Sequence, residues 1–76
     1  MSIQLKKGAI SERCQALGIS RDELARRMQI ATSTAFRVDR GDVTPSARFI
    51  SAFMRVTGEP FEELFEVDAD DEQVPA

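Results

Sequence analysis

The residues best suited to contact a charged partner lie between positions 31 and 40. At about 100° per residue, one half of a helix over this stretch carries Thr32, Ser33, Phe36, Arg37 and Arg40. Hydroxyl and guanidinium groups donate hydrogen bonds and the arginines are cations, so this half is expected to face water or a charged partner. The other half is small and apolar enough to pack, and it consists of Ala31, Thr34, Ala35 and Val38.

Composition argues against several other kinds of chemistry. The 76 residues make one small domain, and with no His and one Cys they lack the ligands of a zinc or haem site. There is no set of nucleophile and base and no Gly-rich phosphate loop, and the adjacent Glu62 and Glu63 diverge on a helix. We therefore expect no catalysis and no cofactor.

No apolar run reaches the ~20 residues of a membrane span and no leader precedes the domain, so a cytoplasmic protein without membrane contact is expected.

Charge is segregated along the chain. Residues 1–58 hold all ten basic residues and five acids, a formal charge of +5, whereas residues 59–76 hold eight acids and no base. This pattern indicates a basic working surface followed by an acidic appendage, with an ordinary solvated surface as the alternative. Residues 68–76 lack periodicity and hydrophobicity, which predicts a disordered tail after a domain over residues 1–67.

Apolar spacing predicts an all-α fold of five helices, because no stretch alternates with period two. The strongest start signal is Ser20, which can cap a helix from Arg21 while Glu23 reaches back to the Ser20 amide. Other helices are expected up to residue 17, over 31–40, after Pro45 and from Pro60. The first four helices, in chain order, are expected to end at Gly18, near Gln29, at Gly41 and at Gly58. The fourth helix should bury Phe49, Ile50, Phe53 and Met54.

Residues 21–40 place two short helices around a four-residue connection, with the small Ala25 where they would cross. This arrangement can set the second helix into a DNA major groove. Five segments in register resemble the Cro/phage-repressor-like (XRE-type) helix-turn-helix family: 16–25 (ALGISRDELA), 28–35 (MQIATSTA), 39–41 (DRG), 44–46 (TPS) and 58–65 (GEPFEELF). The resemblance implies a compact five-helix bundle of the lambda-repressor type that binds double-stranded DNA. It also implies a homodimer on a palindromic operator, and a transcriptional regulator that is most often a repressor.

Two positions in the connection depart from the family pattern. Gln29 stands where the family commonly has Gly, and it costs about 1 kcal/mol if its φ is positive. Ala31 stands where the family often has a capping Ser or Thr. Thr32 can take over that cap, in which case the third helix starts one residue later.

Cys14 lies in the apolar stripe of the first helix, so a small buried hydrophobe is expected rather than a redox sensor. In the family this position often carries an Arg that pairs with an acid at the end of the third helix. Asp39 is therefore expected to pair elsewhere, and the candidate partner is Arg13.

The resemblance implies a base-facing set on the third helix: Thr32, Ser33, Thr34, Phe36 and Arg37. Arg37 can donate two hydrogen bonds to guanine O6 and N7, worth ~1–3 kcal/mol of discrimination, with plain solvation as the alternative. The hydroxyls can meet bases or phosphates, although Thr34 points partly inward on the helical wheel. Phe36 has two open interpretations, which are contact with a thymine methyl or sugar, and packing against the next loop or a second subunit.

A phosphate-facing set is also expected: Arg21, Arg40, Thr44, Arg48, Lys6 and Lys7. Arg21 begins a helix, where free amides and the helix dipole favour a phosphate, and the two lysines can act as an arm. Each has solvation as its alternative, and solvation alone is expected for Arg26, Arg27 and Arg55.

Phe61 and Phe65 belong to a surplus apolar face near the fifth helix, which is the candidate dimer surface. An alternative function is an antitoxin-type or other protein-interaction module with the same fold. Such a module would bind a protein partner through this face or through the acidic tail. The tail has two further interpretations, since it can simply add solubility or compete with DNA phosphates for the basic face.

Overall fold

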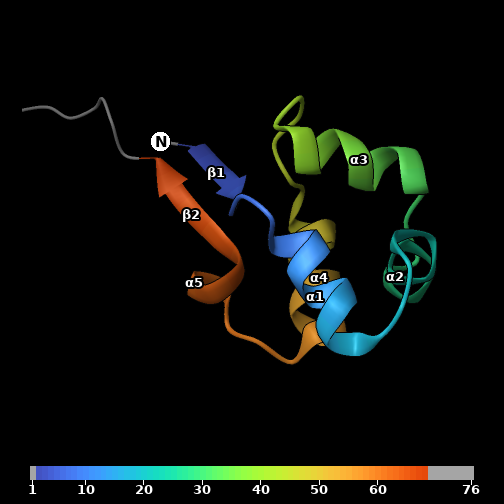
Figure 1. The fold of residues 1–76 in the computed structure, drawn as a ribbon. Helices are drawn as coiled ribbons and strands as arrows, with labels where there is room; N and C mark the ends of the chain where they lie inside the picture. Colours follow the sequence, from blue (N-terminus) through green and yellow to red (C-terminus); the bar gives the residue numbers. More distant parts are fainter. Residues whose placement is uncertain (1, 69–76) are drawn as a thin grey trace, which may run out of the picture.

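Five helices and two short strands make up residues 2–68, the part of the chain that the computed structural model describes. They are β1 (Ser2–Leu5), α1 (Ala9–Leu17), α2 (Arg21–Met28), α3 (Thr32–Arg40), α4 (Ala47–Thr57), α5 (Phe61–Leu64) and β2 (Phe65–Asp68). Figure 1 shows α1 and α4 in the centre, α2 and the two strands on opposite sides of them, and α3 across the top. Within these residues, no helix is both long enough and apolar enough to span a bilayer.

Local capping explains where the helices begin and end. The Ser20 hydroxyl accepts a hydrogen bond from the Glu23 amide over 3.1 Å, and the Ser46 hydroxyl does the same for Phe49 at the start of α4. The Glu23 carboxylate, however, pairs with the side chains of Arg26 and Arg27 rather than with the Ser20 amide. These ion pairs lower the pKa of Glu23. The predicted stops are confirmed at Gly18, Gln29, Gly41 and Gly58, all of which have positive φ.

Gln29 is the one residue other than glycine with positive φ among residues 2–68, at 62°. Its Cβ therefore crowds the backbone in a conformation that glycine adopts freely. We expect Gln29→Gly to raise the free energy of unfolding by about 1 kcal/mol, measured by urea denaturation. As a control, Gln15→Gly in the last turn of α1 should lower it, by up to about 1 kcal/mol. A loss of stability in Gln29→Gly would contradict this account of the turn.

A small antiparallel sheet corrects the prediction of an all-α fold. β1 pairs with β2 in the register Ser2↔Asp68, Ile3↔Val67, Gln4↔Glu66 and Leu5↔Phe65. The predicted fifth helix stops at Leu64, and Phe65 continues as a strand. Each strand has only four residues, too few for a period-two pattern to stand out. β2 includes Asp68, and residues 69–76 of the predicted tail lie outside the described residues.

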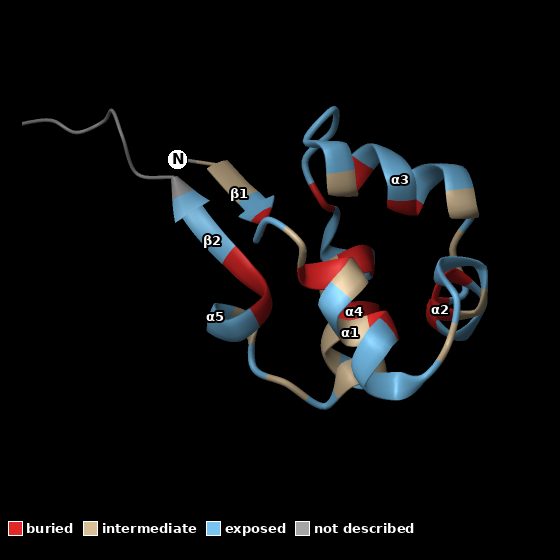
Figure 2. Cartoon of the chain, in the orientation of Figure 1, coloured by how far each residue is buried: buried red, intermediate tan, exposed pale blue. Residues whose placement is uncertain are grey.

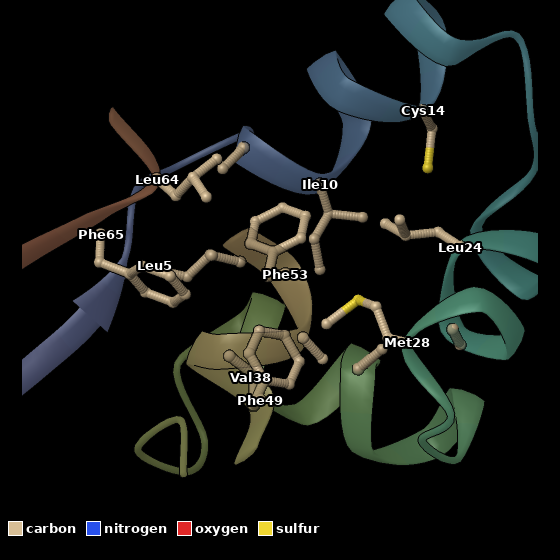
Figure 3. Packing of buried hydrophobic residues seen from close by; sticks show 14 residues of the cluster. Leu5, Ile10, Cys14, Leu24, Met28, Val38, Phe49, Phe53, Leu64 and Phe65 are labelled. Atoms are coloured by element: carbon tan, nitrogen blue, oxygen red, sulfur yellow. The ribbon is translucent and has the colours of Figure 1, made fainter. Parts of the chain in front are cut away.

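The core is built around aromatic rings from α4 and β2. Phe49, Phe53 and Phe65 are each at most 1% exposed, and their ring centroids lie 6.0–6.4 Å apart (Figure 3). The other helices add smaller groups to this cluster, including Ile10, Cys14, Leu24, Met28, Val38 and Leu64. Cys14 is buried as predicted, and burial raises the pKa of its thiol.

Candidate nucleic-acid interface

Small and apolar side chains fix α3 against the rest of the fold. Ala25 of α2 is 1% exposed, as expected for a close helix crossing, and α3 buries Ala35 and Val38. The connection between the two helices folds back on α2, because the Ile30 amide donates to the Ala25 carbonyl over 3.0 Å. One side of α3 therefore packs against the core, and the opposite side is accessible to a partner.

Most of the outward side of α3 is exposed (Figure 2). Ser33, Thr34, Phe36 and Arg37 are all exposed, while Thr32 is half-buried. Thr34 therefore lies further out than the helical wheel indicated. The helix does begin at Thr32, but Ala31 occupies the cap position without a side-chain hydrogen bond. The prediction that Thr32 supplies the cap is wrong.

Asp39 is the only acid in α3, and it is directed toward a cation. Its carboxylate lies 3.8 Å from the Arg21 guanidinium, and its side chain is 20% exposed. The predicted partner, Arg13, instead pairs with Glu12 and Glu59, at 3.1 Å and 2.8 Å. Arg13 is wrong as the partner because its guanidinium faces α5, where it also donates to the Glu63 carbonyl.

The predicted phosphate-facing residues fall into separate environments. Lys7, Arg40 and Thr44 line one groove between β1 and the connection from α3 to α4, together with Asp39, Asp42 and Glu66. Arg40 is paired with Asp42 at 2.9 Å. Arg48 is exposed on α4 outside that groove.

Lys6 and Lys7 do not form a free arm. The Lys6 amide donates to the Leu64 carbonyl and the Lys6 carbonyl accepts from the Ala9 amide, both over 3.0 Å. Pairing of β1 with β2 thus fixes the backbone at this point, while the two lysine side chains remain exposed. The arginines predicted to be merely solvated differ in their surroundings, since Arg26 and Arg27 pair with Glu23 and Arg55 is exposed.

Arg21 and Phe36 form a contact that the sequence did not reveal. The guanidinium carbon lies over the Phe36 ring, 5.7 Å from its centroid, within the range of a cation–π interaction. The same guanidinium donates to the Ser11 hydroxyl over 2.7 Å. No sequence signal marks this contact, because it depends on how α1, α2 and α3 are oriented.

The two phenylalanines of the predicted dimer surface differ in exposure. Phe65 is 1% exposed and lies in the core, so its placement on an outer apolar face is wrong. The physical reason is the change from helix to strand at this residue, which turns the ring toward Phe49 and Phe53. Phe61 is half-buried and stacks on Phe65 with centroids 5.2 Å apart, so it retains some accessible surface.

No family model, curated protein or solved structure matches this chain. The described residues also contain no group of three His, Cys, Asp or Glu side chains placed to hold a metal ion. The outward side of α3 carries hydroxyl donors, guanidinium donors and one exposed aromatic ring.

Proposed function

We propose that this protein binds double-stranded DNA in a sequence-specific manner, inserts α3 into the major groove, and acts as a transcriptional repressor. The observation that carries the proposal is the outward side of α3, which is exposed and basic and whose single carboxylate is directed toward Arg21. A helix fits the major groove of B-DNA, and base edges there offer the acceptors that hydroxyl and guanidinium groups need.

Arg37 is the principal base-reading residue in this proposal. It is exposed near the middle of α3 and forms no ion pair with any residue in 2–68. Its guanidinium is thus able to donate two parallel hydrogen bonds to guanine. Thr32, Ser33 and Thr34, at the end of α3 that enters the groove first, supply hydroxyls for neighbouring bases or phosphates.

Basic residues outside the base-reading set would hold the phosphates. Arg48 carries no ion pair within the described residues, while Arg40 would exchange Asp42 for a phosphate. Lys7 and Thr44 add exposed donors in the groove that Arg40 lines, and Lys6 adds an exposed donor next to Lys7 in the sequence. A two-fold dimer would place two copies of α3 in successive major grooves, ~34 Å apart on a palindromic operator. Phe61 remains a candidate contact between the two copies.

Selection from a pool of randomised duplexes tests this function. Bound sequences are recovered at low salt, and the dissociation constant of the preferred duplex is then measured by fluorescence anisotropy at increasing salt. We expect an enriched palindromic motif. The logarithm of the association constant should fall linearly with the logarithm of salt, with a slope of about −0.9 per phosphate contact. If no duplex binds at low salt, the proposal fails.

A further inference from the structure

An exposed phenylalanine on a proposed recognition surface is unusual. Phe36 is 37% exposed, and it is the only large apolar side chain on the outward side of α3. The other exposed large apolar residues among residues 2–68 lie elsewhere, at Leu17, Val43 and Val67. The exposed part of the ring is apolar surface that a partner's apolar group can cover, and this would be favourable because it removes the ring from water.

Arg21 holds this ring from the side of α2. Its guanidinium lies over the ring, donates to Ser11 of α1, and lies 3.8 Å from the Asp39 carboxylate of α3. These contacts join three helices through one side chain. They also engage one of the guanidinium N–H donors of Arg21 and partly neutralise its positive charge, which lowers its attraction for a phosphate.

We infer that Phe36 recognises the C5-methyl group of a pyrimidine in the major groove, and that Arg21 is a positioning residue for its ring rather than a phosphate ligand. The inference rests on the proposed DNA binding. Thymine and 5-methylcytosine both carry this methyl group at the floor of the major groove, where an apolar side chain can contact it. Arg37, next along α3, would read an adjacent base, so one turn of helix would combine an apolar and a polar contact.

The test removes the methyl group alone from the DNA. In the preferred duplex obtained by selection, each dT is replaced in turn by dU, and each dC in turn by 5-methyl-dC. We expect dU at one position to weaken binding about fourfold, which corresponds to about 0.8 kcal/mol for one methylene-sized group. If selection favours cytosine at that position, 5-methyl-dC should strengthen binding by a similar factor. Neither effect at any position would overturn the inference while leaving DNA binding intact.

Substitutions at Phe36 test whether its ring causes the difference in affinity between methylated and unmethylated duplexes. The methyl ratio is the dissociation constant of the unmethylated duplex divided by that of the methylated duplex. Phe36→Ala should bring this ratio to about one, and Phe36→Leu should retain part of the difference. Leu17→Ala serves as the matched control, since Leu17 is 41% exposed at the end of α1. An unchanged ratio in a folded Phe36→Ala protein would rule out Phe36 as the methyl-reading residue.

Salt dependence distinguishes positioning from phosphate binding at Arg21. Arg21→Ala should reduce the methyl ratio without changing the salt slope, because no phosphate contact is lost. The matched control is Arg27→Ala on the same helix, where the side chain is similarly exposed and paired with Glu23. A slope that becomes shallower by about 0.9 with an unchanged methyl ratio would show that Arg21 is a phosphate ligand after all.

Discussion

Replacing Phe65 with alanine is expected to lower the free energy of unfolding by about 3–5 kcal/mol. The ring is 1% exposed and lies 6.0 Å from Phe53 and 6.4 Å from Phe49, centroid to centroid (Figure 3). Alanine would leave a cavity among these rings that the surrounding helices can only partly close. A domain of 76 residues has a total stability of about 4–11 kcal/mol, so a large share would be lost.

Phe61→Ala is the matched control for this substitution. Phe61 stacks on Phe65 but is only half-buried, so its loss should cost clearly less. Because the chain has no Trp, unfolding in urea is followed by circular dichroism in the far ultraviolet. Equal losses for the two variants would contradict the assignment of Phe65 to the core and Phe61 to its edge. Association measured by sedimentation would show separately whether Phe61 contributes to a dimer.

The largest effect on binding is expected at Arg37. Arg37→Ala should weaken binding to the selected duplex by about 1–3 kcal/mol, roughly 5- to 150-fold, because a bidentate contact to guanine is lost. Sequence preference should relax at one base pair and remain elsewhere. Since Arg37 is exposed and unpaired within the described residues, stability should change little. Fluorescence anisotropy on the selected duplex and on single-base variants measures both effects.

Arg55→Ala provides the comparison for charge alone. Arg55 is an exposed arginine in the last turn of α4, outside the proposed interface. Its removal should leave affinity and base preference nearly unchanged. If Arg37→Ala weakens all duplexes equally and flattens the salt slope, Arg37 contacts a phosphate rather than a base.

The ends of the first four helices and the start of α2 were predictable because their signals are local. Ser20 and Ser46 each cap a helix through an amide three residues ahead, and a residue with positive φ ends four of the helices. The amphipathic spacing of α4 also placed Phe49 and Phe53 correctly in the core, whereas Ile50 and Met54, which were expected to be buried with them, are only half-buried. These features depend on side chains within one or two turns of each other, so the sequence contains them directly.

Features that depend on tertiary orientation were missed. Phe61, Leu64 and Phe65 have helical spacing, yet the chain becomes a strand at Phe65 because β1 is available as a partner. The Arg21 contacts with Asp39 and Phe36 likewise depend on the angle between α2 and α3. No spacing rule specifies these arrangements, since the residues involved lie far apart along the chain.

The sheet has a consequence for the order of events in folding. Pairing of Ser2 with Asp68 joins segments separated by nearly the whole described chain. Closing so long a loop costs conformational entropy before any pairing is gained, whereas helical turns form from neighbouring residues. We therefore expect the strands to pair after the helices have packed together. Substitutions in the strands, such as Val67→Ala, should then raise the unfolding rate and hardly change the folding rate.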